Sequence, residues 1–171
     1  MIDFTNDTLD IGNLPEYEEA PFTSVSKKYW NVVVINLIIL LLILLAGLAA
    51  LLYFSAVFRP YIYVIAGGYL VFAVILFLLY KTDIGRRGYA VREKDILYRS
   101  GIIAISTTII PFSRIQHIAL DEGLFSRMYN LGQLRIFTAG GSTGSLHIPG
   151  IEINQARQIK EILMKQINLA E

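Results

Sequence analysis

The fold of this chain is decided by one almost uninterrupted apolar stretch, which runs from Val32 to Tyr80. It reads VVVINLIILLLILLAGLAALLYFSAVF over residues 32–58, then Arg59-Pro60, then YIYVIAGGYLVFAVILFLLY over residues 61–80. Each run is at least as long as the ~20 residues that a helix needs to cross a bilayer. Proline lacks an amide donor and resists helix continuation, so Arg59-Pro60 predicts a tight turn. The stretch therefore predicts a transmembrane helical hairpin, because a helix satisfies its own backbone hydrogen bonds in hydrocarbon.

The residues that flank the two runs favour the same interpretation. Aromatic side chains with one polar edge prefer the headgroup region, and Trp30, Tyr61 and Tyr80 stand at ends of the runs. Basic residues lie just outside the hairpin, and only Arg59 lies in its turn; the flanking bases are Lys27, Lys28, Lys81, Arg86 and Arg87. Positive flanks stay in the cytoplasm. We therefore expect a multi-pass protein of the plasma (inner) membrane with both termini cytoplasmic. The other interpretation, a buried pair of helices in a soluble protein, does not suit two runs this long and unbroken.

Composition divides the rest of the chain into two further parts. Residues 1–28 form an acidic N-terminal arm, since the first 26 residues hold six acids and no base. Residues 29–81 hold the transmembrane hairpin, with spans at about 32–58 and 61–80. Residues 82–171 form a cytoplasmic domain, which a charged linker over 83–88 joins to the hairpin. The apolar residues of the arm, Phe22 among them, argue against pure disorder, so we expect part of it to add an edge strand or to dock in a groove.

The domain after the hairpin is predicted to be an all-β module. Short β-branched and aromatic runs alternate there with turn residues, which is typical of small antiparallel sheets. Strands are predicted over residues 89–92, 96–99, 102–110, 113–120, 133–139 and 145–148, with a short helix over 124–131. Pro149-Gly150 is expected to stop the last strand. A closing helix follows, with Asn154 as its N-cap and an apolar stripe made by Ile159, Ile162, Leu163 and Ile167.

Four segments of residues 88–168 carry a moderately specific pattern. They are Tyr89-Ala90-Val91 with Asp95 to Gly101, Pro111 to Ile118, Leu124 to Gly132 with Leu134-Arg135-Ile136, and Ile148 to Ile151. Together with the hairpin upstream, they resemble the bacterial pleckstrin-homology-like membrane proteins of the YdbS type. The resemblance implies a pleckstrin-homology-like fold, in which two orthogonal antiparallel sheets are closed at one corner by a C-terminal capping helix. It also implies a role in envelope stress or in resistance to secreted antimicrobial peptides, a role linked to some members.

No residue pattern predicts catalysis, a cofactor or a metal site. The chain has no cysteine, and His117 and His147 lack the two or more further ligands that a zinc site needs. Ser106, Thr107 and Thr108 have no nearby base to activate a hydroxyl. We therefore expect a protein that is not an enzyme.

Four basic residues near the exit from the membrane are the only predicted binding site. Arg86, Arg87, Arg92 and Lys94 are expected to contact lipid headgroups, since residues 81–171 hold 12 Lys and Arg against 8 Asp and Glu and anionic lipid attracts such a domain. A second interpretation, that these bases only set topology and solubility, is equally supported. Bases and aromatics do not interleave as in nucleic-acid readers, so no nucleic-acid partner is expected.

Two hypotheses for function remain at this point. The first is a non-enzymatic membrane-anchored adaptor or scaffold, whose pleckstrin-homology-like domain binds a protein partner, including another copy of itself, at the inner leaflet. The alternative is a small subunit of a membrane transport or efflux assembly. Against the alternative, neither run contains an acid, a base or a histidine within the membrane, the usual mark of an ion path.

Overall fold

The two apolar runs form a helical hairpin, α1 (Tyr29–Phe54) and α2 (Ile62–Arg86). The computed structural model describes residues 20–138 and 145–170, with the side chains described as far as residue 166. Both helices are long and apolar enough to cross a membrane. In their most apolar windows 11% of α1 and none of α2 is buried. A core helix of a soluble protein would be mostly buried, so the predicted transmembrane hairpin is confirmed and the soluble helix pair is not supported.

The turn of the hairpin is longer than predicted. α1 ends at Phe54, not at residue 58, and a short 3-10 helix, η3 (Arg59–Tyr61), precedes α2. The Arg59 guanidinium reaches back to the last turn of α1, where Nε donates to the Leu52 carbonyl (3.2 Å) and Nη2 to the Tyr53 carbonyl (2.8 Å). These carbonyls have no partner within the helix, so the arginine caps the end of α1.

Four antiparallel strands form the first sheet, in the order β1-β2-β3-β4. They are β1 (Thr23–Ser24), β2 (Gly88–Val91), β3 (Asp95–Ser100) and β4 (Ser106–Pro111). β1 comes from the acidic arm and pairs with β2, so the hairpin lies between the first two strands of the sheet. The expected edge strand from the arm is thus present, whereas residues 1–19 lie outside the described part.

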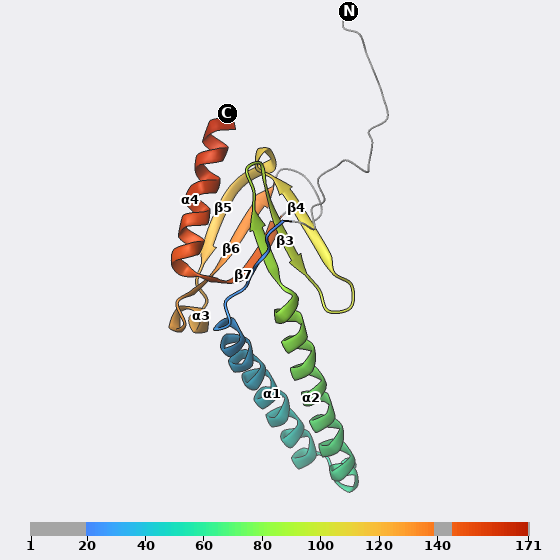
Figure 1. Cartoon of the computed structure of the whole chain (residues 1–171). Helices are drawn as coiled ribbons and strands as arrows, with labels where there is room; N and C mark the ends of the chain where they lie inside the picture. The colour runs from blue at the N-terminus through green and yellow to red at the C-terminus, as the bar shows by residue number, and fades with distance from the viewer. Residues whose placement is uncertain (1–19, 139–144, 171) are drawn as a thin grey trace, which may run out of the picture.

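The second sheet is three-stranded, in the order β5-β6-β7, and is also antiparallel. A 3-10 turn, η4 (Phe112–Arg114), leads into β5 (Ile115–Asp121), and a short helix, α3 (Leu124–Met128), connects β5 to β6 (Leu131–Thr138). β7 (Ser145–Glu152) is followed at once by α4 (Ile153–Ala170). Figure 1 shows the two sheets above the hairpin, with α4 along one side and running away from it.

The core lies between the two sheets and α4. Ile96, Leu134, Ile136, Ile148 and Leu163 have no exposed surface there, and Tyr89, Tyr98 and Phe112 complete it. In β6 the buried Leu134 and Ile136 alternate with partly exposed residues, as expected for a strand with one buried face, whereas consecutive residues are buried in β2 and β3. The predicted order and kind of elements are confirmed: a helical hairpin of membrane-spanning length, then two antiparallel sheets and a C-terminal helix.

Several predicted boundaries were wrong. The charged linker at 83–88 is mostly helix, because α2 continues to Arg86. β4 begins at Ser106, not at residue 102, because the chain turns tightly at Gly101, which has φ +131° and an ideal Cβ only 2.0 Å from the Ala104 carbonyl oxygen. α3 ends at Met128, and the predicted helical residue Leu131 is fully buried in β6.

The last strand and the closing helix also differ from their predicted form. β7 continues through Pro149-Gly150 to Glu152. α4 starts at Ile153, whose amide donates to the Asn130 carbonyl (3.0 Å), so Asn154 lies inside the helix and is not its N-cap. Ile159 and Leu163 face the core as predicted, whereas Ile162 is 51% exposed. The side chain of Ile167 lies outside the described part.

Candidate functional site

The end of the sheet domain next to the hairpin is held by a half-buried ion pair. Asp83, near the end of α2, accepts from the Nε of Arg87 (3.0 Å) and also from its Nη2. Burial by itself lowers the pKa of Arg87, but the hydrogen bond to Asp83 and nearby negative groups leave that pKa raised. Tyr98 lies in β3 beside Arg87, and its pKa is raised mainly because the side chain is buried. These groups form a fixed junction between α2 and the first sheet.

A close backbone approach joins α1 to the second sheet. The Ser26 amide, just before α1, donates to the Gly150 carbonyl in β7 (2.9 Å). Gly150 has φ +74°, and an ideal Cβ there would lie 2.6 Å from Cγ of Tyr29. Both helices of the hairpin are therefore attached to the sheet domain at defined points.

The structure does not bring the four predicted lipid-binding bases together. Arg86 is exposed beside the hairpin and donates to the Ile102 carbonyl, while Arg87 pairs with Asp83. Arg92 and Lys94 lie in the turn after β2, where Arg92 pairs with Asp95 (2.7 and 2.6 Å). At about 3.3 Å per residue, that turn is roughly 13 Å from Gly88 along the strand. Headgroup contact stays a prediction for all four, and Arg86 and Arg87 alone lie at the hairpin end.

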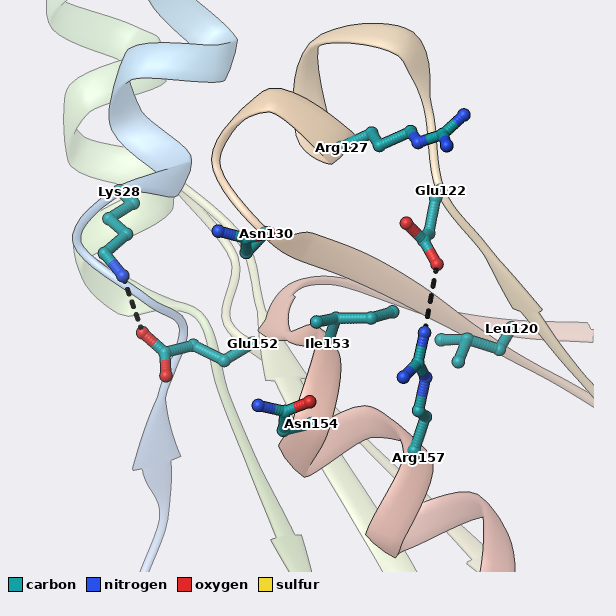
Figure 2. Close-up of a pocket in the computed structure, with 9 residues that line it drawn as sticks. All are labelled: Lys28, Leu120, Glu122, Arg127, Asn130, Glu152, Ile153, Asn154 and Arg157. Atoms are coloured by element: carbon teal, nitrogen blue, oxygen red, sulfur yellow. Dashed lines mark hydrogen bonds and ion pairs between the residues drawn. The ribbon is translucent and has the colours of Figure 1, made fainter.

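An open polar pocket of about 1010 Å³ lies between the start of α1, α3 and the start of α4 (Figure 2). Its charged lining residues are Lys28, Glu122, Arg127, Glu152 and Arg157. Lys28 pairs with Glu152 (3.3 Å) and Arg157 pairs with Glu122 (3.9 Å). The residues come from three segments far apart in sequence, namely residue 28, residues 120–130 and residues 152–157, so no local pattern predicts this pocket.

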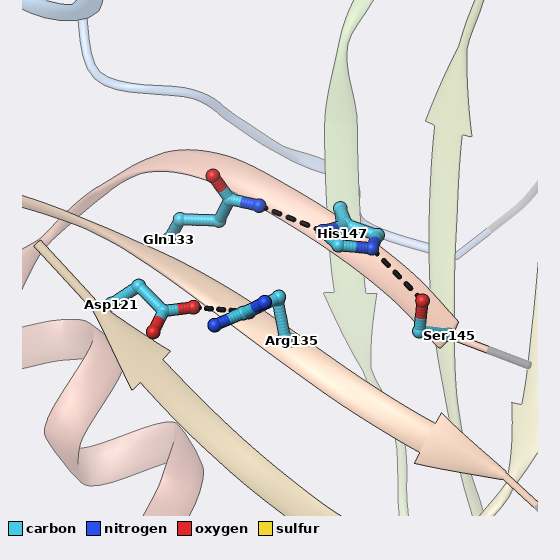
Figure 3. Close-up of polar contacts among 5 residues, drawn as sticks. All are labelled: Asp121, Gln133, Arg135, Ser145 and His147. Carbon is cyan, nitrogen blue, oxygen red and sulfur yellow. Dashed lines mark hydrogen bonds and ion pairs between the residues drawn. The ribbon is translucent and has the colours of Figure 1, made fainter. Parts of the chain in front are cut away.

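The outer face of the second sheet carries both histidines. His147 contacts Gln133 through Nδ1 (2.8 Å) and Ser145 through Nε2 (2.9 Å), as Figure 3 shows. His117 stacks on Phe137, with ring centroids 4.1 Å apart. Beside them Arg135 pairs with Asp121, and this hydrogen bond lowers the pKa of Asp121. In residues 20–138 and 145–170, no three His, Asp or Glu side chains gather to form a metal site. The two histidines therefore make polar and stacking contacts with neighbouring side chains on the outer face of the second sheet.

β4 is an open edge of the first sheet. It pairs with β3 along its whole length, and no strand of the described chain pairs with its other side. Its sequence, Ser-Thr-Thr-Ile-Ile-Pro, holds no charge, and Ile109 is 42% exposed. Natural proteins protect edge strands by shortness, charge, proline or bulges. β1 has two residues, β5 contains a register shift and ends in Asp121, and β7 contains Pro149, whereas β4 has only Pro111 at its end.

Comparison with known proteins agrees with this architecture. The family model of the bacterial PH domain matches residues 12–167, which include the hairpin and both sheets. The chain is also similar to the transmembrane protein YdbS of Bacillus subtilis (strain 168), with 31% identity over 78 residues. That stretch covers 45% of this chain and 46% of YdbS, less than half of either protein. No solved structure matches the chain. Since the family model covers most of the sequence, this membrane protein belongs to the bacterial PH domain family.

Proposed function

We propose that this chain is a non-catalytic membrane scaffold that binds a protein partner through β4. The observation that carries the proposal is the uncharged open edge of this strand. In strand addition, a partner chain pairs with the free backbone groups of an edge strand, and neighbouring side chains give specificity. The exposed Ile109 and the hydroxyls of Thr107 and Thr108 would supply those side-chain contacts.

A second copy of this chain is the partner that the edge fits most simply. Two β4 strands can pair antiparallel about a two-fold axis, so that one edge serves both subunits. β4 carries no charge, so like charges do not oppose one another across such a pair.

We also propose that the hairpin spans the inner membrane and that both of its ends lie in the cytoplasm. The pairing of β1, which precedes α1, with β2, which follows α2, supports ends on one face. Basic residues at these ends favour a cytoplasmic position for both of them, because positive flanks stay in the cytoplasm; they are Lys27, Lys28, Lys81 and Arg86. The PH-like domain then lies at the inner leaflet. A role in envelope stress or antimicrobial-peptide resistance stays a prediction, and so does the transport alternative, which no feature of the described residues favours.

Cysteine crosslinking in native membranes tests the edge directly, because the chain has no cysteine of its own. Thr108→Cys places one thiol in the middle of the exposed edge, and β4 strands that pair about a two-fold axis near residue 108 bring two such residues within the ~4.4–6.8 Å Cα separation of a disulfide. We expect a disulfide-linked dimer on oxidation. Gln155→Cys, exposed on α4, is the matched control and should stay monomeric.

A second variant separates pairing from random collision. Adding Ile109→Lys to the Thr108→Cys chain puts a charge on the edge, and we expect the dimer to fall several-fold. An undiminished dimer would contradict pairing through β4. If the Thr108→Cys chain instead crosslinks to a different protein, β4 is still the binding edge, but its partner is that protein and not a second copy of this chain. If deletion of residues 1–19 is needed before any crosslink forms, the arm of the same chain competes for the edge.

A further inference from the structure

Two segments of the sheet domain expose large apolar side chains on either side of the hairpin. In α3, Leu124 is 77% exposed and Met128 is 71% exposed. In the loop between β3 and β4, Ile103 is 95% exposed and Ile105 is 58% exposed. Outside the hairpin, Ile103, Leu124 and Met128 have the highest exposure among the large apolar residues of the described chain. Single exposed apolar residues are ordinary, so the place of these two pairs in the fold decides what they mean.

Both segments lie at the end of the domain from which the hairpin leaves. Figure 1 shows α3 beside the first turns of α1, and the β3–β4 loop beside the upper end of α2. Contacts agree with this view, since α3 packs against α1 and Arg86 at the end of α2 donates to the Ile102 carbonyl of the loop. The same leaflet that α1 and α2 enter therefore faces both segments.

The level of this leaflet is given by the hairpin itself. Trp30 packs edge-on against Phe77, with ring centroids 5.1 Å apart, where the apolar spans end. Next to them, Lys27 and Lys81 line a crevice of about 410 Å³ between the two helices. Aromatic rings with bases just outside them mark the headgroup region. α3 contacts α1 near its start, so its apolar side chains are close to this level.

The charges at this end fit an anionic surface. Its acids are paired, Asp83 with Arg87, Glu122 with Arg157 and Glu152 with Lys28. Four bases at this end have no ion-pair partner among the residues that the structure describes; they are Lys27, Lys81, Arg86 and Arg127. Bases next to an inner leaflet are attracted to its anionic lipid. A protein partner could cover one apolar segment, but a bilayer faces both, because the hairpin between them crosses it.

We infer that α3 and the β3–β4 loop insert their apolar side chains into the leaflet that the hairpin enters. Leu124 and Met128 enter beside α1, and Ile103 and Ile105 enter beside α2. The sheet domain is then seated on the bilayer at two further points and does not swing freely on its two helical connections. This contact is made by the domain itself, and it is independent of strand pairing at β4.

Depth-dependent quenching in lipid vesicles tests the inference on the full chain. The full chain carries one cysteine, at Leu124 or at Ile103, labelled with a fluorophore and reconstituted at low density into vesicles of phosphatidylethanolamine and phosphatidylglycerol. We expect strong quenching by a nitroxide near the top of the acyl chains, and weak quenching by iodide in the water. Ile162→Cys is the matched control, because this isoleucine is 51% exposed on α4, about 14 Å along the helix from Ile153. Its fluorophore should show the reverse pattern.

A second readout removes the influence of the apolar fluorophore. The unlabelled thiols react with a charged, membrane-impermeant reagent, and we expect reaction at positions 103 and 124 to be several-fold slower than at position 162. Both substituted side chains are exposed, so the fold should tolerate each change. The inference requires both segments to insert. Iodide quenching and thiol reactivity at either position equal to those at position 162 overturn it.

Discussion

Gly150 shows how a residue without a side chain fixes the place where the hairpin meets the sheets. The sequence Pro149-Gly150 predicts the end of a strand, yet β7 continues through it. Gly150 instead adopts φ +74° and lets the ring of Tyr29 approach its α-carbon. Only glycine takes this conformation at low cost, but a sequence does not say which distant ring the missing side chain makes room for.

Gly150→Ala should destabilise the protein through both effects. The new Cβ would lie 2.6 Å from the Tyr29 ring, and the backbone conformation adds about 1–3 kcal/mol of strain. We expect a clear fall in the melting temperature of the detergent-solubilised full chain. Gly123→Ala is the control, since Gly123 has φ −67° and its Cβ would meet nothing nearer than 3.7 Å. Equal melting temperatures for the two variants would show that the contact with Tyr29 is dispensable.

Neighbouring residues on α4 allow a sharp test of the core. Leu163 is fully buried, whereas Ile162 is 51% exposed. Leu163→Asp leaves a cavity and buries a carboxylate without a partner, so we expect a loss of several kcal/mol, roughly 3–5, in the free energy of unfolding. Ile162→Asp should change it little. Thermal unfolding of the full chain, followed by circular dichroism, compares the two. The full chain is needed because β1 precedes the hairpin. Similar losses for both variants would mean that α4 is rotated on the sheets.

At the scale of elements, periodicity and composition predict which helices and strands exist better than where they end. The length of the apolar runs fixes the hairpin, because no other structure satisfies so much backbone in lipid. Alternating runs predict most of the strands after it. The ends depend on contacts between distant parts of the chain. Arg59 caps α1 by reaching back over the turn, and α4 starts where Asn130 accepts the Ile153 amide.

The candidate sites were predictable only in part for the same reason. Arg86, Arg87, Arg92 and Lys94 are close in sequence, but β2 separates the second pair from the first. The polar pocket joins Lys28, Glu122 and Arg157 from three distant elements. The sequence of β4 predicts a strand, but only the order of strands in the folded sheet shows that this strand has an open edge. The exposed α3 has only five residues, too few to show a clear apolar face.

For the whole molecule, the orientation in the membrane decides whether the proposed surfaces face the cytoplasm. Val57 is 72% exposed in the turn of the hairpin, and Glu93 is exposed in the turn after β2. We expect Val57→Cys to react with an impermeant thiol reagent on intact cells, because the basic flanks hold the other end inside. Glu93→Cys should react only after the membrane is opened. Labelling of Glu93→Cys alone on intact cells would invert the orientation.

The position of the hairpin between β1 and β2 has a consequence for how the protein is made. β1 leaves the ribosome first, and its partner strand follows only after both helices have been synthesised. The two strands can meet only if they end on the same side of the bilayer, which requires α1 and α2 either both to cross it or both to stay out of it. A chain that inserts a single helix leaves β1 and β2 on opposite faces and cannot complete its first sheet. We therefore expect the β1–β2 pair in chains whose two helices have both inserted, and not in chains that hold a single helix in the membrane.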